Sequence, residues 1–182
     1  MNKRNIVISG VLLIAFIFCT LGIGFAGEKS KRHLYKEKGF SIEIPTDWKM
    51  IKGKQNIIAL IALSPQEKPS DKQCSLCVVV EPKPKGIETT DDCLKKHINY
   101  IGKTFKDFKK IDSGKTKIGD NEAAWLSYSF RMKKYNNIEL KAIDYILVKG
   151  KRVYVLSFSA PIEAFSGFTK VFKEISGSFK FE

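Results

Sequence analysis

The chain has 182 residues and a formal net charge of +13, with 32 Lys and Arg residues against 19 Asp and Glu residues. It has no G-x-S-x-G nucleophile elbow, no phosphate-binding glycine loop and no H-E-x-x-H zinc motif, which argues against the enzyme classes that use them. It also has no internal repeat or low-complexity segment, so a single ordinary domain is expected.

Residues 1–26 predict a secretory signal peptide. Lys3 and Arg4 form a positive n-region, an uncharged and mostly apolar run extends from Ile6 to Phe25, and Gly24-Phe25-Ala26 supplies small residues for cleavage. A run of this length also suits an uncleaved membrane anchor, so cleavage and retention both stay open. Phe18 precedes Cys19 where a lipobox needs a small residue, which disfavours lipoprotein processing. The domain is therefore expected outside the cytoplasmic membrane, in the periplasm or secreted.

Residues 27–36 are rich in charge and predict a short linker, so the folded domain is expected over residues 37–182. Without residues 1–26 the chain has 156 residues, and the loss of Lys3 and Arg4 lowers the charge from +13 to +11. Outside the membrane the expected partners are an envelope protein or an anionic lipid or polymer surface, and not nucleic acid. A solvated surface that aids solubility is the alternative explanation of this charge. A monomer or weak dimer is expected.

Three strands are predicted in the first part of the domain. In GFSIEIPTDW, Phe40, Ile42 and Ile44 alternate with polar residues, and Pro45 then ends the strand. The apolar runs 57–63 and 76–81 predict two more strands, and the proline-containing stretch 64–73 predicts the loop between them.

A helix is predicted next. Thr89 or Thr90 caps it, and Asp91 and Asp92 place acids in the first turn, where the helix dipole favours them. Its apolar stripe consists of Leu94, Ile98, Ile101 and Phe105. On its solvent-exposed face, four lysines predict a basic surface: Lys95, Lys96, Lys103 and Lys106.

An antiparallel meander and a second helix complete the predicted fold. Strands are expected at 107–117, 123–132, 138–148 and 152–160, separated by turn signals. The second helix is expected to start at Pro161 and to end near Gly177, with the stripe Ile162, Phe165, Phe168, Phe172 and Ile175. Phe179 and Phe181 predict a last short strand. This order predicts an α+β fold, in which helices cover an antiparallel sheet.

Four segments, taken in order, resemble the PsbP-like family. They are GFSIEIPTDW, IGDNEAAWLSYSF, VKGKRVYVLSFSAP and FKEISGSFKF, and the resemblance covers about residues 35–182. It implies an α-β-α sandwich around an antiparallel sheet and no catalysis, because members of this family act by docking to proteins or membrane complexes. No residue that would dock to a photosystem is recognised, and the signal peptide argues against the nuclear Ran-binding role found in the family.

The remaining cysteines and one histidine have the spacing of a weak zinc-site candidate. Cys74-x2-Cys77 is followed after fifteen residues by Cys93-x3-His97, and the last two residues share a helix face. Residues three apart in a strand point to opposite faces, however, which argues against joint ligation by Cys74 and Cys77.

The exported setting favours a disulfide instead. Cys77–Cys93 is the preferred pair and Cys74–Cys93 the second, while three buried free thiols remain an alternative. A thioredoxin-like redox role is disfavoured, because Cys74 and Cys77 do not lie at a helix N-terminus.

No residue is assigned a catalytic role. His97 is interpreted as a residue at the flank of the helix, Asp91 and Asp92 as helix-terminal acids, and Trp48 and Trp125 as core or corner residues. The sequence thus predicts an exported, non-catalytic binding or assembly domain that acts at the cell envelope and has no cofactor. The alternative is a metal- or redox-linked exported protein that uses Cys74, Cys77, Cys93 and His97.

Overall fold

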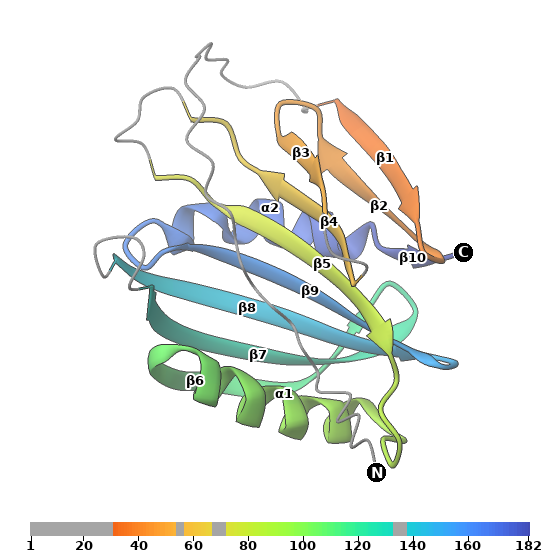
Figure 1. The fold of residues 1–182 in the computed structure, drawn as a ribbon. Helices are drawn as coiled ribbons and strands as arrows, with labels where there is room; N and C mark the ends of the chain where they lie inside the picture. The colour runs from red at the N-terminus through yellow and green to blue at the C-terminus, as the bar shows by residue number, and fades with distance from the viewer. Residues whose placement is uncertain (1–30, 54–56, 67–71, 133–137) are drawn as a thin grey trace.

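The computed structural model describes residues 31–53, 57–66, 72–132 and 138–182. The predicted signal peptide lies outside these residues. The described residues form ten strands and two helices, whose arrangement can be followed in Figure 1. In chain order they are β1 (Arg32–Glu37), β2 (Phe40–Pro45), β3 (Lys49–Lys52), β4 (Ile58–Leu63), β5 (Ser75–Pro82), α1 (Thr90–Thr104), β6 (Lys106–Ile118), β7 (Asn121–Met132), β8 (Ile138–Lys149), β9 (Arg152–Pro161), α2 (Phe165–Gly177) and β10 (Lys180–Phe181).

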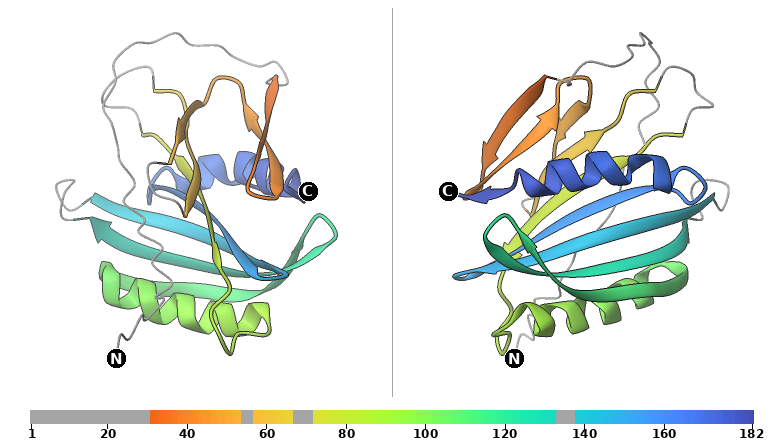
Figure 2. Two further views of the ribbon diagram at one scale, coloured as in Figure 1. Left: turned by 45° about the vertical axis from the view of Figure 1, so that its right-hand side comes forward. Right: turned by 180° about the vertical axis from the view of Figure 1, so that it is seen from behind.

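The centre of the fold is a seven-stranded antiparallel sheet in the order β3-β4-β5-β9-β8-β7-β6. Helix α1 lies on one face of this sheet and α2 on the other, as Figure 2 shows from two sides. A second sheet, β1-β2-β10, lies beside α2 and joins the two ends of the described chain. The predicted α+β class and the layered α-β-α arrangement are confirmed.

The two faces of the sheet bury separate cores. On the α2 side a continuous apolar cluster includes Phe40, Leu76, Phe158, Phe172 and Phe179. On the α1 side the apolar residues form two smaller clusters, one around Cys77 and Cys93 and one around Ile101, Tyr128 and Phe130. Strand alternation explains the division, because neighbouring residues of one strand point to opposite faces.

The predicted linker is wrong where it overlaps β1. Residues Arg32–Glu37 pair with Phe40–Pro45 in an antiparallel hairpin. Lys38 and Gly39 form its turn with φ values of 52° and 80°, the left-handed conformations that tight hairpin turns require. The many charged residues of β1 do not prevent strand formation, because one side of this edge strand faces solvent while Tyr35 packs against the core.

The predicted start of the second helix is also wrong. Pro161 is the last residue of β9, paired with Leu140, and its carbonyl accepts a hydrogen bond from Ala164 N–H in the turn before α2. The helix begins at Phe165, so Ile162 lies outside it and is 42% exposed. Gly177 is the last residue of α2 and has no positive φ, and Ser178 caps the helix in a right-handed conformation.

The predicted first helix begins as expected. Thr89 is its N-cap, and a capping box joins Thr89 and Asp92 reciprocally. The helix is too short to cross a bilayer, and no other helix within the described residues is long and apolar enough to do so.

Candidate functional site: a lysine surface over a buried polar cluster

Eight lysines lie on α1 and along the neighbouring strand β6, where successive residues such as Lys109 and Lys110 point to opposite faces of the strand. All eight are exposed, and α1 packs directly against β6, which is an edge strand of the large sheet. We call them the α1–β6 lysine surface: Lys95, Lys96, Lys103, Lys106, Lys109, Lys110, Lys115 and Lys117. The four lysines predicted from the sequence belong to it, and the other four come from the edge strand.

The acids of the same segment are already engaged by other groups. Asp92 accepts hydrogen bonds from Thr89, which lower the pKa of its carboxyl. Asp107 lies 3.8 Å from Arg131, and Asp112 accepts a hydrogen bond from the backbone N–H of Ser113.

Asp91 is the acid that pairs with the lysine surface. Its carboxylate lies 2.8 Å from the ammonium of Lys115 and raises the pKa of that lysine. The other seven lysines of the surface form no ion pair with any residue that the structure describes. Their charges are therefore balanced only by solvent and salt within the described part of the chain.

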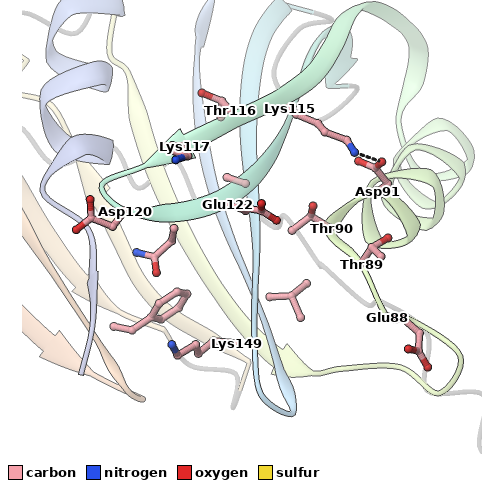
Figure 3. A pocket seen from close by; sticks show the side chains of 14 residues that line it. Glu88, Thr89, Thr90, Asp91, Lys115, Thr116, Lys117, Asp120, Glu122 and Lys149 are labelled. Atoms are coloured by element: carbon pink, nitrogen blue, oxygen red, sulfur yellow. Dashed lines mark ion pairs between the residues drawn. The ribbon is translucent and has the colours of Figure 1, made fainter.

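A groove of about 750 Å³ borders this surface at the N-terminal end of α1. In Figure 3, Asp91 points from α1 toward Lys115 on β6, while Lys117 and Asp120 lie at the β6–β7 hairpin. The groove carries acids as well as lysines, Glu88 and Glu122 among the acids. Its mixed charge does not favour a ligand of one sign, although Lys115 and Lys117 of the lysine surface line it. The excess positive charge therefore comes from the six lysines of that surface that do not line the groove.

A second feature lies beneath α1. His97 is 4% exposed, and its Nε2 lies 2.6 Å from Oδ2 of Asp144, which is fully buried on β8. The hydroxyl of Tyr128 on β7 donates to the same carboxylate oxygen over 3.1 Å. Ser157 on β9 is the buried cross-strand neighbour of Asp144, and Glu81 is buried on β5, where it interacts electrostatically with Cys93 and His97 of α1. We call these five residues the α1 polar cluster.

This cluster corrects the interpretation of His97 as a flank residue. The most buried positions of α1 are Cys93, His97 and Ile101, spaced four apart, and the predicted stripe residues Leu94 and Ile98 are half-buried beside them. The buried face of α1 is therefore centred on Cys93 and His97, each one residue before the predicted stripe residues Leu94 and Ile98.

Two acids of the cluster went unrecognised although the sequence carries a signal for each. Asp144 interrupts the apolar alternation of Ala142 and Ile146 on one face of β8, and Glu81 ends the apolar run of β5. A carboxyl at a position where the alternation requires an apolar residue indicates a buried partner.

Burial shifts the pKa values around this cluster. It raises the pKa of Glu81 to about 7, and the charge of His97 opposes this shift. Burial and then the charge of Asp144 raise the pKa of the Cys77 thiol to about 12 and hold that of Tyr128 well above its ordinary value. Burial and the charge of Glu81 raise the pKa of Cys93 to about 11.

The structure does not form the predicted disulfide. Cys77 on β5 and Cys93 on α1 belong to the same apolar cluster, yet both are free thiols, as is Cys74. Shared burial in one apolar cluster does not by itself form a bridge, because a disulfide also requires Cα atoms about 4.4–6.8 Å apart and suitably directed Cβ atoms.

The four residues of the zinc candidate are not brought together. Cys74 belongs to the core on the α2 side and Cys77 to the core on the α1 side, while His97 is paired with Asp144. Within the described ranges, no three His, Cys, Asp or Glu side chains are arranged to hold a metal ion.

The aromatic and remaining histidine candidates have structural surroundings. Trp48 is 7% exposed and lies in the core, as predicted. Trp125 is half-buried on β7 and covers Gly114 of β6, where a Cβ atom would come within 3.0 Å of the indole Nε1. His33 is exposed on β1.

Comparison with known proteins completes the description of the site. A family model described as the serine/threonine kinase C-terminal domain matches residues 33–181. The chain belongs to this family. The match includes both helices and all strands except the first residue of β1, and hence the lysine surface and the polar cluster. A comparison of the chain with curated proteins found no match.

Solved structures show that the chain has a PsbP-like fold, as the sequence predicted. CyanoP, the PsbP of Synechocystis sp. PCC 6803, matches with a TM-score of 0.60 and 14% identity over 88% of this chain and 98% of that one. LpqN of Mycobacterium tuberculosis, described as involved in cell envelope biogenesis, matches with a TM-score of 0.59 and 12% identity, over 84% of this chain and 91% of that one. The Saccharomyces cerevisiae Ran-binding protein Mog1p matches with a TM-score of 0.60 and 5% identity, over 84% of this chain and 96% of that one.

Proposed function

We propose that this protein is a non-catalytic binding domain that acts at the cell envelope and docks to an anionic surface through the α1–β6 lysine surface. The observation that carries this proposal is the set of seven exposed lysines that lack an ion-pair partner among the described residues. Like charges held side by side repel one another, and an anionic partner relieves that repulsion. Lipid headgroups and anionic polymers are the polyanions present at an envelope.

Protection of the sheet edge is the competing explanation. Lysines on an edge strand prevent edge-to-edge pairing of sheets, and β6 also has register shifts near Lys106 and Lys110 that serve the same end. This explanation accounts for the lysines of β6 but not for Lys95, Lys96 and Lys103, because helix α1 has no open hydrogen-bonding edge.

Burial of the reactive groups supports a role without catalysis. A general base has to reach the proton that it removes, yet His97 is 4% exposed and its Nε2 is engaged by Asp144. The thiolate is the reactive form of cysteine, and the raised pKa values of Cys74, Cys77 and Cys93 disfavour it. The metal- or redox-linked alternative therefore has less support than docking.

An envelope location is supported by two independent observations. Residues 1–26 have the pattern of a signal peptide or membrane anchor, and LpqN, which shares the fold, is described as involved in cell envelope biogenesis. If the N-terminal segment is retained as a membrane anchor, it would hold the protein at the membrane. The lysine surface on α1 and β6 would then supply a second attachment to that membrane.

Vesicle binding tests the proposal. We expect the protein to bind vesicles of mixed phosphatidylcholine and phosphatidylglycerol at low salt and to be released at ~0.5 M salt, where the screening length falls below roughly 5 Å. Substitution of Lys95, Lys103, Lys106 and Lys110 by Gln removes four charges from the lysine surface, and we expect it to abolish the salt-sensitive binding.

The matched control removes the same charge elsewhere. Lys49, Lys151, Lys170 and Lys173 are exposed and lie outside the lysine surface, and their replacement by Gln should leave most of the binding intact. Equal loss in both variants would attribute the binding to net charge alone. Absence of salt-sensitive binding by the parent protein would reject the membrane surface as the partner.

A further inference from the structure

The α1 polar cluster joins one helix to four strands of the sheet. Cys77, Ser157 and Asp144 are cross-strand neighbours on β5, β9 and β8, and their side chains face α1. His97 reaches this row from the helix and Tyr128 reaches it from β7. Helix α1 and the strands β5, β7, β8 and β9 thus meet at one buried group of polar side chains.

Several atoms of the cluster have no partner. Oε1 of Glu81, Nδ1 of His97 and Oδ1 of Asp144 are buried and form no hydrogen bond with any described residue. Nε2 of His97 is within hydrogen-bond distance of Asp144, so Nδ1 is the ring nitrogen left without a partner among the described residues. The side chains that bridge α1 and the sheet therefore keep unused hydrogen-bonding capacity.

Glu81 is the acid of the cluster that is poised to change charge near neutral pH. Burial favours its neutral form and raises its pKa to about 7, against the opposing charge of His97. Asp144 on β8 lies against His97 and raises the pKa of Tyr128 on β7. The other titratable or charged groups around the cluster are Cys77 on β5, Lys83 after β5, and Asp92, Cys93 and Lys96 on α1.

We propose that Glu81, His97 and Asp144 form a pH-responsive clamp that holds α1 against the sheet more firmly in mildly acidic than in mildly alkaline solution. In acid, Glu81 is neutral and the His97–Asp144 pair is the polar link between the layers. In alkali, ionised Glu81 places a second carboxylate beneath the helix. Burying this additional charge disfavours the closed arrangement.

The direction follows from proton linkage. A carboxyl whose pKa is higher in the folded than in the unfolded protein binds more protons when folded. The stabilisation from neutral Glu81 is complete below its unfolded pKa of about 4.5 and is lost as the pH rises through about 7. An acid whose pKa is lower in the folded than in the unfolded protein has the opposite effect, because its stabilisation is lost as the pH falls.

The N-terminal half of α1 is expected to respond first. Its buried residues are Cys93 and His97, which lie over the polar cluster, whereas Ile101 in the C-terminal half packs with the aromatic cluster that includes Phe130. A carboxylate formed at Glu81 therefore weakens the turns around Cys93 and His97 before it affects the last turns of the helix.

Unfolding and hydrogen exchange at about pH 5.5 and about pH 8.5 test the clamp, with Glu81→Gln compared with the parent protein. We expect the unfolding constant of the parent to rise about 10- to 100-fold more over this range than that of the variant, because Gln cannot ionise. Amide exchange rates are corrected for the pH dependence of intrinsic exchange. At the higher pH we expect faster exchange in the N-terminal turns of α1. Glu122→Gln, at an exposed site, is the control and should keep the parent's pH dependence.

Two outcomes would overturn the proposal. One is an identical pH dependence in the parent and in Glu81→Gln. The other is a pKa below about 5 for Glu81, measured by carboxyl carbon NMR in the unmodified protein, since such a group does not change charge near neutral pH. The NMR measurement needs no variant and stays decisive if Glu81→Gln folds poorly. Both readouts are properties of the protein alone, so they remain separate from the outcome of the docking test.

Discussion

Strand β5 shows the difference between the two faces of the large sheet. Leu76 and Val78 point toward α2 and join a continuous apolar core, whereas Cys77 and Glu81 point toward α1 and border a polar cluster. Both sets are buried, and they belong to the same eight-residue strand. The difference between the faces thus lies in the chemistry of the buried side chains rather than in the amount of burial.

The two faces contribute differently to the protein. Phe158 and Phe172 on the α2 side have ring centroids 4.8 Å apart, and such packing stabilises the fold in a way that is insensitive to pH. The α1 side buries His97 and Asp144, whose desolvation offsets much of their attraction. The face that bears the lysine helix is therefore expected to be the more easily loosened of the two.

The largest expected effect concerns the α2 face. Phe158 is fully buried and contacts the rings of Phe172 and Tyr145, so Phe158→Ala should lower the free energy of unfolding by about 3–5 kcal/mol. Urea denaturation of the parent and the variant measures this loss. Because no ionisable group is removed, the loss should be the same at acidic and alkaline pH. A loss below about 1 kcal/mol would contradict a core centred on this face.

A smaller effect is expected at the polar pair on the α1 face. Asp144→Asn removes the charge that His97 and Tyr128 contact and should cost about 3 kcal/mol, because breaking a buried pair leaves its partner unmatched. Replacing both His97 and Asp144 by Leu should cost less than this single change, since no charge then stays buried. Urea denaturation of the three proteins gives the comparison. A double variant less stable than Asp144→Asn would show that the pair itself stabilises the fold.

The smallest expected effect concerns the thiol beneath α1. With a pKa of about 11 instead of 9.0, Cys93 holds about 100-fold less thiolate at pH 8 than an ordinary cysteine. Alkylation by iodoacetamide should accordingly be slow in the folded protein and should reach Cys74, Cys77 and Cys93 only after denaturation. Mass spectrometry counts the modified residues. If a single thiol among these three is modified after denaturation without reductant, the predicted disulfide is present.

Local patterns were sufficient to predict most of the elements. Thr89 and Asp92 place the start of α1 through a capping box, and the alternation in GFSIEIP places β2, because both depend on residues close together in the chain. The end of β9 and the start of α2 were misplaced for a related reason. A proline is accepted both at the last position of a strand and at the first turn of a helix, and the pairing of Pro161 with Leu140 decides between them.

The candidate site was predictable only in part. The exposed lysines of α1 follow from helical periodicity, so Lys95, Lys96 and Lys103 were identified from the sequence. The polar cluster was not, because His97 and Asp144 are 47 residues apart and meet only when α1 packs across β8. By itself the sequence determined the helices, most of the strands, the α+β class and the basic face of the first helix. Only the tertiary structure decided which face of α1 is buried, which carboxyls face it and that Cys77 and Cys93 remain separate, because these depend on contacts between layers distant in sequence.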